Sequence, residues 1–140
     1  MATRRLVIVG VLLCLFSVVA SANQVEIFPI DQVRPGLQGI GKTVVQGTEI
    51  EEFNVSVIGI IEQVEPTPPL IMVRVSGDAI DRSGGISSGM SGSPVYIDGK
   101  LLGAISYGYE YTDHRVGLVT PAEPMLKLLP EFEEPSRDYK

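Results

Sequence analysis

Turn residues divide this chain into short segments, and that division limits what it can fold into. The 140 residues include 15 glycines and 10 prolines, and the stretches between them have the character of strands. The clearest period lies in 49–64, where Phe53, Val55 and Val57 alternate with polar residues. A two-residue alternation is typical of a strand with one buried face. The pattern therefore predicts a mostly β protein.

Further segments with strand character follow the same reasoning. They are 43–45, 70–75, 95–97, 101–107 and 116–120. Asp98-Gly99 predicts a two-residue hairpin between the third and fourth of these, because glycine removes the cost of a positive φ in a type I′ turn. Pro35-Gly36 predicts a type II turn, and the nearby glycines extend it into a tight loop that leads to 43–45.

After the last strand, Pro121 opens a predicted short helix at 122–129, whose apolar residues would cover one end of a barrel. These are Met125, Leu126, Leu128 and Leu129. Five or so strands do not obviously close a barrel, so we expect an exposed strand edge.

The segment 1–22 has the pattern of a signal peptide. Arg4 and Arg5 precede an apolar run at 6–19, and 20–22 supplies the small residues that signal peptidase requires. The run is shorter than the ~20 residues that a membrane-spanning helix needs. We expect cleavage after Ala22 and export to the periplasm, cell envelope or medium, with the export machinery as the only membrane contact. The alternative is an uncleaved N-terminal anchor.

Removing 22 of the 140 residues leaves 118, enough for one β domain at 23–130 with a core, followed by an acidic tail at 131–140. The net charge changes from −6 to −8, because two arginines and no acidic residue leave. An acidic chain without a basic cluster argues against a nucleic-acid partner. The one cysteine, Cys14, is removed and the one histidine is His114, so we expect no disulfide, metal or cofactor.

A glycine- and serine-rich segment at 83–94 carries the chemistry. A serine nucleophile needs a tight turn on which backbone N–H groups converge to form an oxyanion hole. In the run Gly-Met-Ser-Gly-Ser-Pro at 89–94, Gly89 and Ser91 would supply these N–H groups, and Gly92 would allow the sharp turn. The alternative is a plain glycine-serine loop, which explains the small residues but not the abrupt switch into hairpin strands.

Four motifs together resemble the end of the stage IV sporulation protein B (SpoIVB) peptidase domain, a family of trypsin-like serine peptidases. They are the run at 89–94, the hairpin at 98–104, Gly-Leu-Val-Thr-Pro at 117–121 and Met-Leu at 125–126. The whole stretch 33–126 also resembles the opening segment of larger exported bacterial proteins that carry this domain.

The resemblance implies a trypsin-like half-barrel of antiparallel strands and hairpins with a short C-terminal helix. It also implies a peptide or protein substrate or partner. Ser91 takes the place of the nucleophile, and Gly89 with Ser91 the place of the oxyanion hole.

The histidine base that the resemblance implies is missing from its usual motif. Family members carry it in a Gly-His pair, and this sequence has none. The only histidine, His114, follows Ser91 in the sequence and lies in the loop 108–115, beyond the hairpin. In a trypsin-like barrel that loop lies near the specificity pocket rather than on the side of the base. We interpret a loop histidine beside Asp113 and Arg115 as a surface residue.

Three hypotheses about function remain. The chain is the N-terminal portion of a longer peptidase, or a standalone pseudo-peptidase whose turn binds a peptide or partner, or an active peptidase with an unusual base. The base would be His114 or a lysine, Lys42 or Lys100, made basic by burial. Three carboxylates could orient it: Asp78, Asp81 and Asp113. We favour the first two hypotheses, and we expect a bound peptide to lie along an exposed strand edge.

Overall fold

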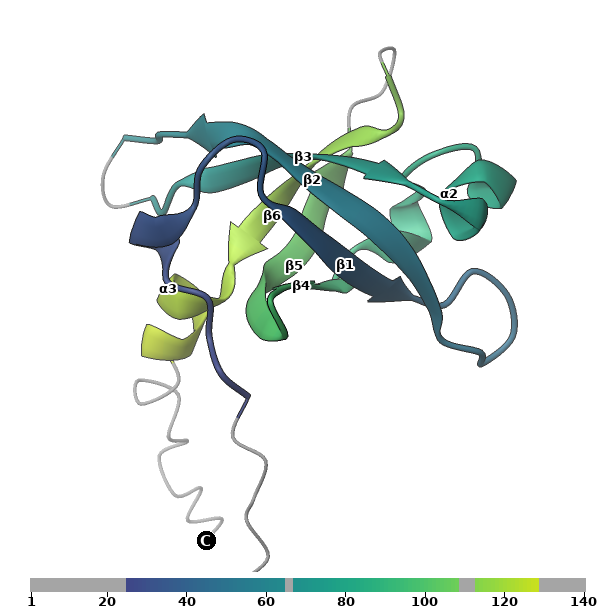
Figure 1. The fold of residues 1–140 in the computed structure, drawn as a ribbon, viewed down its shortest axis with the longest axis horizontal. Helices are drawn as coiled ribbons and strands as arrows, with labels where there is room; N and C mark the ends of the chain where they lie inside the picture. The colour runs from purple at the N-terminus through teal and green to yellow at the C-terminus, as the bar shows by residue number, and fades with distance from the viewer. Residues whose placement is uncertain (1–24, 65–66, 109–112, 129–140) are drawn as a thin grey trace, which may run out of the picture.

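Six antiparallel strands close into a barrel in the computed structural model, which describes residues 25–64, 67–108 and 113–128 (Figure 1). The strands are β1 (Gln38–Thr43), β2 (Glu51–Ile61), β3 (Leu70–Ser76), β4 (Pro94–Ile97), β5 (Lys100–Gly108) and β6 (Val116–Pro121). Around the barrel their order is β1-β2-β3-β6-β5-β4. Helices α2 (Asp78–Ser83) and α3 (Ala122–Lys127) lie at opposite ends of it (Figure 1). This architecture confirms the predicted mostly β, antiparallel fold with a short C-terminal helix.

The first strand is where the sequence prediction was wrong. β1 spans Gln38–Thr43 rather than 43–45, and it contains Gly39 and Gly41, which we had placed in a tight loop. A Cβ on Gly39 would collide with the Tyr96 carbonyl oxygen, and one on Gly41 would collide with the Phe53 ring. These glycines therefore mark close packing inside a strand rather than a turn.

The expected exposed edge is also wrong for the six described strands, because β1 closes the barrel. It pairs with β2 over its whole length and with β4 through Ile40↔Tyr96 and Gly41↔Val95. Closure leaves each strand with a neighbour on both sides. β5 nevertheless runs beyond β4, which pairs with it only as far as Ala104.

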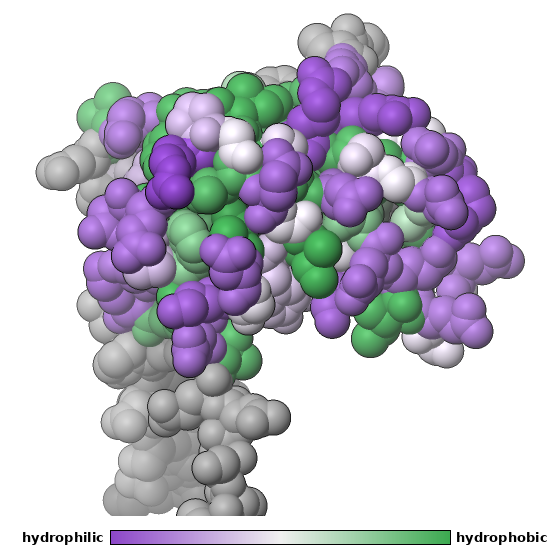
Figure 2. Space-filling view, in the orientation of Figure 1, coloured by the Kyte–Doolittle hydropathy of each residue, from purple (hydrophilic) through white to green (hydrophobic). Residues whose placement is uncertain are grey.

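Alternating residues fill the barrel as predicted, with Phe53, Val55 and Val57 of β2 all buried. Four residues outside the strands extend this core: Phe28, Val33, Ile80 of α2 and Met90 of the serine-rich segment. On the outside, hydrophilic side chains cover much of the face in Figure 2, and apolar ones appear in several separate places. Burial of apolar side chains inside the barrel therefore provides the main stabilisation of the fold.

The predicted Asp98-Gly99 hairpin is confirmed. Asp98 has φ 50° and Gly99 has φ 78°, the two positive angles of a type I′ turn, and Ile97 pairs with Lys100 across it. The turn centred on Pro35 and Gly36 also forms, with Gly36 at φ 89°.

The two helices differ from the sequence prediction in different ways. α2 was missed, because a six-residue helix with only Ala79 and Ile80 buried has too few turns to show a period. α3 begins as expected after Pro121 but ends at Lys127. The apolar side chains of Met125 and Leu126, and of Leu128 just after the helix, cover the barrel end only in part, since 39–49% of each is exposed.

Some predictions fall on other parts of the chain. The signal peptide at 1–22, the acidic tail at 131–140 and Leu129 all lie outside the described residues. Within the described ranges, no helix has the length and apolar character needed to cross a membrane.

The hairpin geometry gives a stability prediction. Replacing Gly99 with Val should lower the melting temperature by about 5 °C or more, because a β-branched residue resists a positive φ. Gly59→Val is the matched control, since a Cβ at Gly59 meets no atom within 4 Å and its φ is not positive. Thermal unfolding by circular dichroism measures both. Equal effects of the two substitutions would contradict the turn assignment.

Candidate active site

The predicted nucleophile turn begins as a 3₁₀ turn at Ser88–Met90 and continues through Ser91 and Gly92 into β4. Met90 is 1% exposed, and its N–H donates to Ser87 O over 2.9 Å. Gly92 has φ 86°, the left-handed conformation expected for a sharp turn, and its N–H donates to Ile105 O over 2.7 Å. Burial of Met90 in the core and the hydrogen bond from Gly92 to β5 therefore anchor the turn on both sides. Ser91, which lies between them, is exposed.

A buried hydrogen bond ties the end of this turn to strand β1, which pairs with β4. The Ser93 hydroxyl donates to Thr43 Oγ1 over 2.9 Å, and both residues are buried. The backbone of Ser93 also accepts from the Ile105 N–H over 2.9 Å. Sequence reasoning missed this pair because its members lie 50 residues apart. The only signal was a second serine in the Gly-Met-Ser-Gly-Ser-Pro run.

The predicted oxyanion donors are only partly available. Gly89 is exposed, but the Ser91 N–H donates within the 3₁₀ turn to Ser88 O over 3.4 Å. That distance exceeds the usual 2.7–3.2 Å of an N–H···O bond, so this interaction is weak. A bound carbonyl would have to replace it before the Ser91 N–H could stabilise an oxyanion.

Ser91 and His114 line the same cavity, which has a volume of about 440 Å³. One wall is formed by residues 86–88 and 91 from the turn segment, and the other by 105–108 at the end of β5. The structure thus brings the predicted nucleophile and the only histidine to one place. No hydrogen bond joins their side chains among the described residues, and His114 is exposed.

The backbone of His114 is fixed against the segment that leads into the turn. His114 O accepts from the Ile86 N–H over 2.7 Å. Gly85 lies so close that a Cβ there would be 2.5 Å from the His114 Cβ and 2.6 Å from its carbonyl oxygen. The position of His114 therefore depends on a glycine at position 85.

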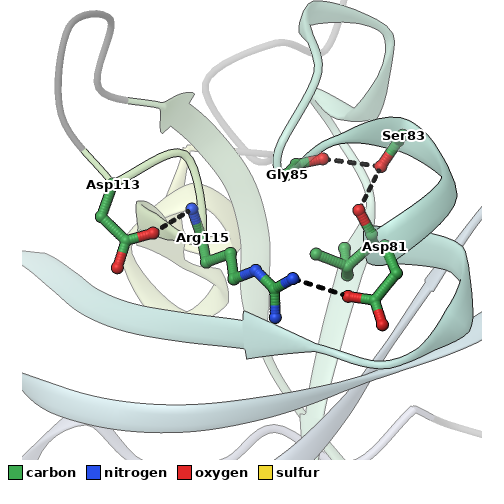
Figure 3. Close-up of polar contacts among 6 residues, drawn as sticks. Asp81, Ser83, Gly85, Asp113 and Arg115 are labelled. Carbon is green, nitrogen blue, oxygen red and sulfur yellow. Dashed lines mark hydrogen bonds and ion pairs between the residues drawn. The ribbon is translucent and has the colours of Figure 1, made fainter.

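Ion pairs hold the residues on either side of His114. Arg115 contacts Asp81 over 2.9 Å, and Arg74 contacts Asp113 over 2.5 Å (Figure 3 draws the first). The Arg115 N–H and the Arg74 guanidinium hold the pKa of Asp113 below its ordinary value. The carboxylates of Asp81 and Asp113 therefore both form ion pairs with arginines. Asp78, the third predicted orienting residue, lines a different cavity, beside Ile40 and Gly77.

The two lysines proposed as alternative bases lie elsewhere. Lys42 pairs with Glu52 over 3.3 Å and Lys100 pairs with Glu26 over 3.1 Å, and their side chains are 43% and 46% exposed. A lysine acts as a base when its site is desolvated or a cation lies beside it. These two lysines are instead exposed to solvent, and each is paired with a carboxylate. Neither lines the cavity at Ser91.

Metal chemistry has no counterpart in the described part of the chain. No group of three or more histidine, cysteine, aspartate or glutamate side chains there is placed to hold a metal ion.

The barrel and its serine turn have the fold of trypsin-like serine proteases. The similar solved structures include the Rv3671c protease in its inactive form, with 16% identity, a TM-score of 0.55, and coverage of 78% of this chain and 55% of that one. A serine-to-alanine mutant of Rv3671c from M. tuberculosis H37Rv, also inactive, gives 14% identity, a TM-score of 0.55, and coverage of 76% and 52%. The chain thus spans about half the length of these structures.

The family is more specific than the fold. The SpoIVB peptidase S55 family model matches residues 4–126, and the chain belongs to this family. A comparison with curated proteins gives no match.

Two glycines near the site should differ in their tolerance of alanine. Gly85→Ala should lower the melting temperature by about 5 °C or more, because Gly85 has φ 121° and the new methyl group would collide with His114. Gly89→Ala should change it by less than about 2 °C, since nothing lies within 4 Å and φ is not positive. Thermal unfolding of both variants tests this, and a larger loss at Gly89 would contradict the described turn.

Proposed function

We propose that this chain is an exported SpoIVB-family peptidase domain that holds the serine nucleophile turn but is catalytically incomplete by itself. The observation that carries the proposal is the anchored turn, which presents the exposed Ser91 beside a cavity without a base bonded to it. A serine hydroxyl at neutral pH becomes nucleophilic only with a base in hydrogen-bond reach. The 140-residue sequence contains no Gly-His pair to supply one.

A missing base is explained if the histidine comes from a segment outside this sequence, in a longer protein or in a partner. The likeness of 33–126 to the opening segment of larger family proteins supports this. The pseudo-peptidase remains an alternative, in which the cavity at Ser91 binds a peptide without cleaving it. In either case the ligand is a peptide or protein. Since the strands close into a barrel, we place it at residues 106–108 of β5, beyond the end of β4.

One observation favours a second candidate function, an active serine peptidase with His114 as base. Ser91 and His114 line one cavity, and this function would require their side chains to move into hydrogen-bond contact there. The surrounding geometry weighs against it. Asp113 and Asp81 pair with Arg74 and Arg115, and neither carboxylate is hydrogen-bonded to the His114 imidazole among the described residues.

A fluorophosphonate probe separates these functions. The mature chain, 23–140, should be labelled slowly or not at all, because an oxyanion turn without a base retains only a small part of a triad's rate. Mass spectrometry measures the labelled fraction, with Ser91→Ala as the blank. Rapid labelling that requires both Ser91 and His114 would make the chain an enzyme in its own right and overturn the proposal.

If the wild-type chain is unreactive, a second arm distinguishes the remaining alternatives. Adding a Gly-His segment from a longer family member should restore labelling of Ser91 if the base is supplied from outside. No restoration, together with measurable peptide binding, would favour the pseudo-peptidase.

Export is proposed from the pattern of the segment 1–22 and is tested separately. The mature protein should begin at Asn23 and be recovered from the periplasm or medium, as measured by N-terminal sequencing. An Ala22→Arg variant should remain uncleaved, because signal peptidase requires a small residue before the cleavage site. Intact cytoplasmic protein that begins at Met1 would contradict the proposal.

A further inference from the structure

The cavity at Ser91 has walls whose chemistry restricts what can enter it. Ile86 supplies apolar surface from one side, whereas Ile105 on the other is only 2% exposed, and several serines supply hydroxyl groups. None of the described lining residues is an aspartate, glutamate, lysine or arginine. Apart from His114, these residues offer no counter-ion, so a charged side chain in this cavity would lose water without a matching gain from them.

Ile86 determines how far the cavity reaches into the barrel. A Cβ on Gly117 of β6 would collide with Ile86 Cδ1, and a Cβ on Gly108 of β5 would lie 3.6 Å from Ile86 Cγ2. The Ile86 side chain thus lies over both glycines. Gly117 is buried and does not line the cavity, so Ile86 separates it from the open space.

The position of Ile86 is fixed from both ends of the residue. Its N–H donates to His114 O over 2.7 Å, and its side chain packs against the hydrophobic core. A wall held in this way keeps its shape when a ligand binds, which is the condition for selecting one side chain over another.

We propose that this cavity binds an uncharged aliphatic side chain of a peptide, at the residue whose carbonyl faces Ser91, and that Ile86 sets this preference. The inference rests on the proposed function, in that a peptide binds at the serine turn. It adds the class of ligand and the residue that selects it. Ile86 acts through direct contact with the bound side chain, and its Cδ1 limits the depth of the pocket.

The test measures binding rather than cleavage, so it does not require a base. Acetylated tetrapeptides that differ only in a C-terminal Val, Phe, Lys or Asp are titrated into the 15N-labelled mature chain. Dissociation constants come from amide shifts of 86–88 and 105–108. The Val peptide should bind about tenfold or more tightly than the Lys and Asp peptides.

Two substitutions test the role of Ile86. Ile86→Asp should reverse the order, so that the Lys peptide binds about tenfold more tightly than the Val peptide. Ile86→Ala keeps an uncharged wall but opens the space over Gly117, and should shift the preference from Val to Phe. The Ile86→Ala variant tests the role of Ile86 if the Ile86→Asp variant does not fold. Ile58→Asp, at an exposed isoleucine of β2 outside the cavity, is the matched control and should leave the order unchanged.

The outcomes separate the two proposals. Peptide binding at the cavity with a preference for Lys or Asp, or with an order that neither Ile86 variant alters, overturns the inference and leaves the proposed function intact. Absence of shifts at the cavity with every peptide overturns the inference as well. The nucleophile role of Ser91 is then still judged by fluorophosphonate labelling.

Discussion

The pairing of β1 with β4 is the interaction on which the rest of this structure depends. Only two residue pairs join the strands, and the buried hydrogen bond from Ser93 to Thr43 lies directly beside them. Gly41 makes the pairing possible, because a side chain there would collide with Phe53 in the core. Breaking the hydrogen bond would leave a buried hydroxyl unsatisfied, which costs about 1–3 kcal/mol. Barrel closure and placement of the serine turn therefore depend on the same contacts between β1 and the start of β4.

The same contacts explain how Ser91 is held in place. Met90 and Gly92 anchor the turn on both sides of Ser91, so the serine is held in place without any contact from a base. The Ser91 N–H is held by a weak bond inside the 3₁₀ turn, which under the proposed function a substrate carbonyl would replace. Under the proposed function, local contacts of the barrel position Ser91, whereas activation of its hydroxyl would require a base from elsewhere.

Much of the fold follows from local sequence rules. Alternation in β2 and the Asp-Gly turn predicted a strand and a hairpin, because both patterns act over a few residues. The prediction at Gly41 was wrong for the opposite reason. A glycine is needed there because Phe53 of the neighbouring strand β2 packs against it, whereas local rules interpret a glycine as part of a turn. The shared cavity of Ser91 and His114 also depends on tertiary contacts, through Gly85 and Ile86. The sequence predicted a tight turn at Ser91, but not the tertiary contacts that surround it.

The central claim is that Ser91 is positioned but not activated. The most direct test is the pH dependence of the second-order rate constant for fluorophosphonate reaction with the mature chain. Without a general base, the rate should rise continuously with hydroxide concentration and reach no plateau near neutrality. A sigmoidal profile that levels off above neutral pH, and that disappears in His114→Ala, is the signature of an imidazole base and would contradict the claim.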